Sequence, residues 1–115
     1  MTLEQLQAMS DTELNELAAV KVMGKLYQNG KMWDELEGRP GHRLIGEWNP
    51  TVNMNDAFEL LRALGKLGIL YRIKFSEIIS KTFTASTGEL AIWPNAIFLL
   101  EPKHITIASI LAKEE

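Results

Sequence analysis

The spacing of apolar residues changes near the middle of the chain, and this change restricts the fold more than any other feature. Between residues 53 and 67 the apolar side chains recur every three or four positions, which predicts an amphipathic helix. After Gly68 apolar and polar residues alternate, which is typical of a half-buried strand. Both periods within 115 residues predict a single α+β domain over 1–115. The apolar residues of this predicted central helix are Met54, Ala57, Phe58, Leu61, Leu64 and Leu67.

The segment 69–100 is predicted to form antiparallel strands. Ile69, Tyr71, Ile73 and Phe75 alternate with Leu70, Arg72 and Lys74, and residues 78–85 repeat the pattern with many β-formers. The apolar run 90–100 is interrupted at Pro94, so it predicts a strand pair or a kinked edge strand. A last helix is predicted over 102–113, and a competing interpretation begins that helix at Asn95 and kinks it at Pro102.

The N-terminal part begins with a helix and continues into a long connection. Ser10 and Glu13 have the spacing of a helix cap, which predicts a first helix over 11–24 that ends at Gly24. Residues 25–52 are rich in glycine and show no clear period, so they are predicted to form a long loop or to conceal a short strand at 43–48.

Charge and composition exclude several classes of protein. The chain has no cysteine, so it holds no disulfide scaffold and no thiolate metal site. Its net charge of −3 disfavours a dedicated nucleic-acid binder. The charges are uneven, because residues 1–20 carry four acids and no base, whereas 62–81 carry five bases and one acid. No run of about 20 apolar residues could span a membrane, and the start does not resemble a signal peptide, so a cytoplasmic location is expected.

Three stretches resemble a known family. Residues 14–24, 48–61 and 105–112 are similar to the first helix, the tryptophan–proline turn with its helix, and the last helix of the phage ABA-sandwich domain family. The resemblance implies a small three-layer α/β/α sandwich, with an antiparallel meander of about three strands and helices packed on it, and a phage or prophage origin. The chain departs from the family pattern at 89–104. The resemblance supplies no catalytic residue.

Candidate chemistry is sparse. Asp34, Glu35 and Glu37 lie near His42 but match no metal-binding pattern, and no metal or cofactor is expected. The loop 38–43 combines glycines with basic residues, although it matches neither the P-loop nor the dinucleotide fingerprint. His104, near the start of the last helix, is in no recognisable motif.

These features favour a non-enzymatic phage or prophage accessory protein that acts by binding, with a host protein, such as a defence or metabolic enzyme, as the expected target. A second copy of the chain is another candidate partner, since the run 90–100 is unusually apolar. Two alternatives remain: a small-ligand or nucleotide-binding module using Arg39, His42 and Arg43, and a small hydrolase using His42 with Asp34 or Glu35. The predicted partner-binding residues are the aromatic side chains Trp33, Trp48, Trp93 and Phe98.

Overall fold

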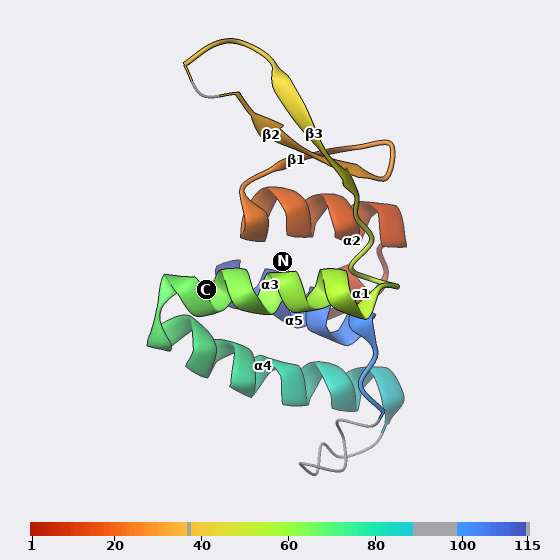
Figure 1. The fold of residues 1–115 in the computed structure, drawn as a ribbon. Coiled ribbons are helices and arrows are strands. Elements are labelled where there is room, and N and C mark those ends of the chain that lie inside the picture. The colour runs from red at the N-terminus through yellow and green to blue at the C-terminus, as the bar shows by residue number, and fades with distance from the viewer. Residues whose placement is uncertain (37, 89–98, 115) are drawn as a thin grey trace.

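The computed structural model describes residues 1–36, 38–88 and 99–114. A small antiparallel sheet lies at one end of a stack of helices (Figure 1). The α+β class is confirmed, as is an antiparallel sheet of three strands with helices packed on it. The described helices lie on one side of this sheet, so the described residues do not form the three-layer α/β/α arrangement that the resemblance implied. In chain order the elements are α1 (Leu3–Gln7), α2 (Asp11–Leu17), the π-helix η1 (Ala18–Met23), β1 (Leu26–Gln28), β2 (Lys31–Glu35), β3 (His42–Glu47), α3 (Met54–Leu67), α4 (Ile69–Thr87) and α5 (Pro102–Glu114).

The sheet lies in the segment that was expected to be a long loop. The loop prediction for 25–52 is therefore wrong, although the short strand proposed at 43–48 corresponds to β3. The strands follow one another as a meander in the order β1-β2-β3. Asn29 and Gly30 join β1 to β2 with φ values of 57° and 75°. Positive φ at both positions is the type I′ turn, for which Asn-Gly is the preferred pair.

Residues 69–87 form helix α4, so the strands predicted there are wrong. Ile69 and Ile73, which the alternation placed in the core, are 63% and 50% exposed. The core side of α4 instead follows helical spacing, with Phe75, Ile79 and Phe83 packed inward. These residues are odd-numbered and four apart, a spacing that suits a strand face and a helix face equally. The predicted strand residues 89–98 lie outside the described part of the chain.

Hydroxyl side chains accommodate the β-formers within α4. Ser76 donates a hydrogen bond to the Arg72 carbonyl at 2.9 Å, and Thr82 donates to the Ile78 carbonyl at the same distance. Each bond spans four residues, so the hydroxyl is satisfied inside the helix rather than by a neighbouring strand. A segment rich in serine, threonine and isoleucine therefore remains helical when one of its faces is buried.

Helix α5 occupies the centre of the helical stack, although the helix at 53–67 was the one expected there. It contacts α1, α2, η1, α3 and α4. All residues from His104 to Ile110 are buried, as expected for a helix surrounded by other elements. The helix predicted at 102–113 is confirmed. It begins at Pro102 after two non-helical residues, so the competing interpretation of a helix that continues through Pro102 is wrong.

The predicted helix ends are confirmed. The Ser10 hydroxyl accepts a hydrogen bond from the Glu13 N–H at 3.2 Å. Gly24 ends the first helical segment in the left-handed conformation, with φ 66° and ψ 31°. Asn53 caps α3 by accepting from the Asp56 N–H at 3.2 Å.

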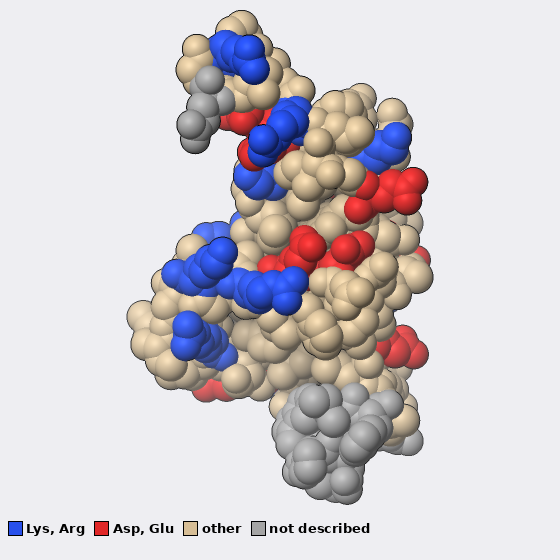
Figure 2. Space-filling view, viewed as in Figure 1, with Lys and Arg blue, Asp and Glu red and all other residues tan. Residues whose placement is uncertain are grey.

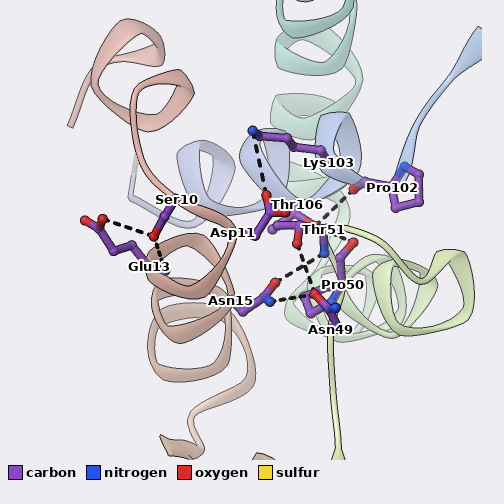
Figure 3. Close-up of polar contacts among 10 residues, drawn as sticks. All are labelled: Ser10, Asp11, Glu13, Asn15, Asn49, Pro50, Thr51, Pro102, Lys103 and Thr106. Atoms are coloured by element: carbon purple, nitrogen blue, oxygen red, sulfur yellow. Dashed lines mark hydrogen bonds and ion pairs between the residues drawn. The ribbon is translucent and has the colours of Figure 1, made fainter. Parts of the chain in front are cut away.

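A buried polar cluster joins α2, α3 and α5 (Figure 3). The Asn15 side chain donates to Asn49 Oδ1 at 2.7 Å and accepts from the Thr51 N–H at 3.2 Å. The Thr51 hydroxyl donates to the same Asn49 oxygen at 3.1 Å. On the other side, Thr106 Oγ1 of α5 lies 2.9 Å from the Pro50 carbonyl. The turn before α3 is thus held by hydrogen bonds from two helices that are distant in sequence.

We expect Asn15→Ala to lower the free energy of unfolding by about 1–3 kcal/mol, because the Thr51 N–H would lose its acceptor in a buried position. Asn55→Ala is the matched control, since Asn55 is exposed on α3. Urea denaturation of both variants measures the difference. Equal losses in the two variants would contradict the structural role of the cluster.

Gly68 connects α3 to α4 with φ 122° and ψ 177°, a conformation almost restricted to glycine. Gly68→Ala is expected to lower the free energy of unfolding by about 1–3 kcal/mol. Gly65 is helical, and a Cβ there would meet Arg72 Nε at 3.7 Å, an ordinary contact. Gly65→Ala should therefore raise stability by about 0.5–1 kcal/mol. Thermal and urea unfolding test whether the two signs differ as expected.

Candidate partner-binding surface on the sheet

The two faces of the sheet have different surroundings. Tyr27 and Met32 are directly opposed on β1 and β2, and both pack against the main core. Since neighbouring residues of a strand point to opposite faces, Leu26 and Trp33 lie on the outer face, and Leu44 of β3 continues their row. Leu26 and Leu44 are 44% and 46% exposed. The outer face therefore carries an apolar row across all three strands.

An irregularity in β3 adds to this surface. Met32 pairs with Gly46 and Trp33 pairs with Leu44, so Ile45 is an extra residue in β3. A bulge of this kind bends the strand and turns its edge away from regular pairing. Ile45 is 47% exposed, which extends the apolar surface at the edge of the sheet.

Trp48 anchors the sheet to the helices. Its ring is 3% exposed, and its indole N–H donates to Glu59 Oε2 of α3 at 3.2 Å. The Tyr27 hydroxyl donates to the Trp48 carbonyl at 3.0 Å, and the two rings meet edge to face at 6.3 Å. Of the two predicted partner-binding tryptophans in the described chain, Trp48 is enclosed in the core, while Trp33 lies on the outer face. Trp93 and Phe98 lie outside the described residues.

The Trp33 side chain is partly buried, and its indole nitrogen has no acceptor. Trp33 Nε1 is one of two buried side-chain atoms among the described residues without a hydrogen-bond partner; the other is Ser109 Oγ. Buried polar groups are normally paired, so an unpaired indole on an otherwise exposed face is unusual.

Ion pairs brace the inner face of the hairpin. Asp34 lies 2.7 Å from Lys25 Nζ and 3.4 Å from an Arg43 guanidinium nitrogen. The hydrogen bond from Lys25 is the main reason that the pKa of Asp34 lies below its usual value. Arg43 is 70% exposed, so this ion pair lies at the surface of the hairpin.

The predicted ligand loop lies at the projecting end of the β2–β3 hairpin (Figure 1). Arg39, His42 and Arg43 are all exposed and line none of the four cavities described in the structure. Arg39 forms no ion pair with any described residue. The structure thus brings the three residues together as a basic tip rather than as an enclosed pocket.

The geometry places one of the predicted hydrolase pairs side by side and separates the other. His42 pairs with Glu35 across the two strands, whereas Asp34 pairs with Arg43 on the opposite face. Both His42 and Glu35 are exposed, and no hydrogen bond joins them in the described structure. A general base acts within hydrogen-bond reach of the proton that it abstracts, and in the described residues no such bond orients His42.

The second histidine is part of the core. His104 is 4% exposed, its Nδ1 accepts from the Glu101 N–H at 3.0 Å, and its ring meets Phe83 edge to face at 5.6 Å. Burial lowers the pKa of His104, and the nearby Glu101 carboxylate opposes this effect in part. The histidine is therefore neutral at pH 7 and helps to start α5.

Within the described ranges, no group of three or more histidine, aspartate or glutamate side chains is placed to hold a metal ion. None of the helices in those ranges is both long and apolar enough to cross a membrane.

Comparisons with protein-family models, curated proteins and solved structures found no match.

The lowered pKa of His104 predicts a pH dependence of stability. Below about pH 6.5, the ordinary histidine pKa, the unfolded chain binds a proton that the folded chain resists, so stability falls as the pH drops. Above that pH His104 is neutral in both states, so its effect on the free energy of unfolding no longer changes with pH. Urea unfolding at pH 7, 6 and 5 gives the dependence of the free energy of unfolding on pH. We expect His104→Gln to reduce this dependence and the exposed control His42→Gln to retain it. An unchanged slope in His104→Gln would contradict the assignment.

Proposed function

We propose that this chain is a non-enzymatic binding protein that holds a partner protein on the outer face of its sheet. The observation that carries the proposal is the apolar row of Leu26, Trp33 and Leu44, on the side of the sheet opposite the core. An apolar patch on a projecting element is typical of an interaction site rather than of a free surface. The partly exposed ring of Trp33 in this row supports the same assignment, because aromatic side chains dominate protein interfaces.

The charges around the row indicate the chemistry of the partner. Arg39, His42 and Arg43 gather at the hairpin tip, and Figure 2 shows Lys and Arg side chains on this projecting part. The outer face itself carries Glu35 and Glu47 beside Lys31, whereas Arg43 pairs with Asp34 on the inner face. A partner with charges of both signs around an apolar patch would match this surface, because opposite charges favour encounter and fix the orientation of the complex.

The resemblance to phage ABA-sandwich sequences supports a phage or prophage origin and a host protein as the target. Inhibition of a host defence or metabolic enzyme is the activity that we propose for the complex.

The test uses one substitution on the outer face and one control. Leu44→Asp places a charge in the apolar row, while Val52→Asp changes a residue that is 63% exposed outside the sheet. Tagged wild type and both variants are used to capture proteins from a lysate of the bacterial host. We expect one host protein to be retained by wild type and Val52→Asp and lost with Leu44→Asp, with at least a tenfold weaker affinity when titrated in purified form.

Both substitutions are at exposed positions, so circular dichroism and thermal unfolding should show folded proteins. Capture of the same protein by all three chains would overturn the assignment of the outer face. Capture of this chain itself would identify self-association instead.

A further inference from the structure

A second exposed apolar surface lies far from the sheet, at the junction of α3 and α4. Leu67, Ile69, Leu70 and Ile73 surround Gly68 and form what we term the α3–α4 corner. Their exposed fractions are 46%, 63%, 69% and 50%. The corner is a projecting end of the helical stack (Figure 1), and because about half or more of each of the four side chains is exposed there, we call it the apolar knob.

These four side chains lie outside the two core clusters. Helix α4 packs on α3 and α5 through Phe75, Ile79 and Phe83, which point to the other side. Leucine and isoleucine at positions that a polar residue could fill are therefore not explained by packing within the chain. Their clustering at one convex point suggests an interface.

Basic residues surround the corner. Arg62, Lys66 and Arg72 are exposed, and none forms an ion pair within the described chain. The Arg72 guanidinium donates two hydrogen bonds to the Gly65 carbonyl, at 2.9 and 3.2 Å, which hold its charge at the end of α3. Figure 2 shows Lys and Arg side chains gathered at this end of the molecule. The occupant of the corner should therefore combine an apolar recess with carboxylates.

The same chain has such a recess in its acidic N-terminal part. A cavity of about 320 Å³ opens beside α2 and η1, with Met9, Leu17 and Val20 among its apolar lining. Val20 is 50% exposed, and the volume would hold about ten groups the size of a water molecule. We call this the η1 cavity.

Charged groups of both signs line the η1 cavity, with Lys21 and Met1 beside its carboxylates. Glu13 and Glu16 line it, and neither forms an ion pair with a described residue. The cations beside them are already engaged, because Glu114 binds both the Lys21 ammonium and the N-terminal amino group. The uneven charge of the sequence thus becomes two surfaces of opposite sign, an acidic recess and an apolar knob surrounded by basic residues.

We propose that the α3–α4 corner of one copy of this chain docks into the η1 cavity of a second copy. The contact is head to tail, since knob and cavity are different parts of one molecule. Such contacts continue into rings or open chains unless one surface is blocked. Glu13 and Glu16 of one copy would face Lys66 and Arg72 of the next around an apolar centre.

The test blocks one surface at a time. Leu70→Asp disables the knob, and Val20→Asp disables the cavity. Multi-angle light scattering over micromolar to millimolar concentrations should show wild type growing in mass and each variant remaining at the 13.0 kDa of one chain. An equimolar mixture of the two variants retains one intact knob and one intact cavity, so it should form a dimer and stop there. Val52→Asp should associate like wild type.

A charge exchange provides a second measurement should Val20→Asp fail to fold. Glu16→Lys and Lys66→Glu should each weaken association at least tenfold, and mixing the two should restore it in part. Added salt should weaken the wild-type contact, since it screens exposed charge pairs.

A wild type that stays monomeric at all concentrations would overturn the proposal. So would association that Leu70→Asp leaves intact, or a mixture of the two blocked variants that remains monomeric. These outcomes are independent of partner capture by the sheet, because Leu44→Asp leaves both the corner and the cavity unchanged.

Discussion

The hydrogen bonds of Asn15 hold together parts of the chain that would otherwise have no fixed relation. Its amide binds Asn49 and Thr51 in the turn before α3, and the same turn is bound from α5 by Thr106. Because all of these groups except Asn49 are buried, each lost bond would leave an unpaired polar atom away from water. The cluster therefore fixes one relative position of α2, α3 and α5, which apolar contacts alone would define less sharply.

This position determines which surfaces remain free. Since α5 is enclosed by the other helices, the described helices use their apolar faces mainly to cover it. The sheet is attached through Trp48 and the inner residues Tyr27 and Met32, and on its outer face Leu26 and Leu44 are 44% and 46% exposed. Helices α3 and α4 both pack on α5, and the α3–α4 corner where they join remains exposed. Both apolar surfaces are consequences of a small core in which one helix occupies the centre.

The sequence predicts where helices end better than it predicts which side of a helix or strand is buried. Ser10, Gly24 and Asn53 act through neighbours three to five residues away, so their local pattern is sufficient. The sheet could also have been found, because Asn29-Gly30 is the strongest short hairpin signal. Helix α4 could not be decided locally, since positions 75, 79 and 83 fit both periods and the packing against α5 favours the helix. Asn15 gives no local sign of burial, because its partners are more than 30 residues away.

The same limit applies to the candidate site. Trp33 and Trp48 are equivalent as sequence features, yet one lies on the outer face and the other in the core, because the register of β1, β2 and β3 determines which side each residue takes. The two proposed surfaces use separate elements, so binding at one leaves the other open. If copies join through corner and cavity, each assembly would present several sheet faces to one target. Linked binding sites then raise the effective affinity without any new contact, which would suit a small protein with a modest interface of its own.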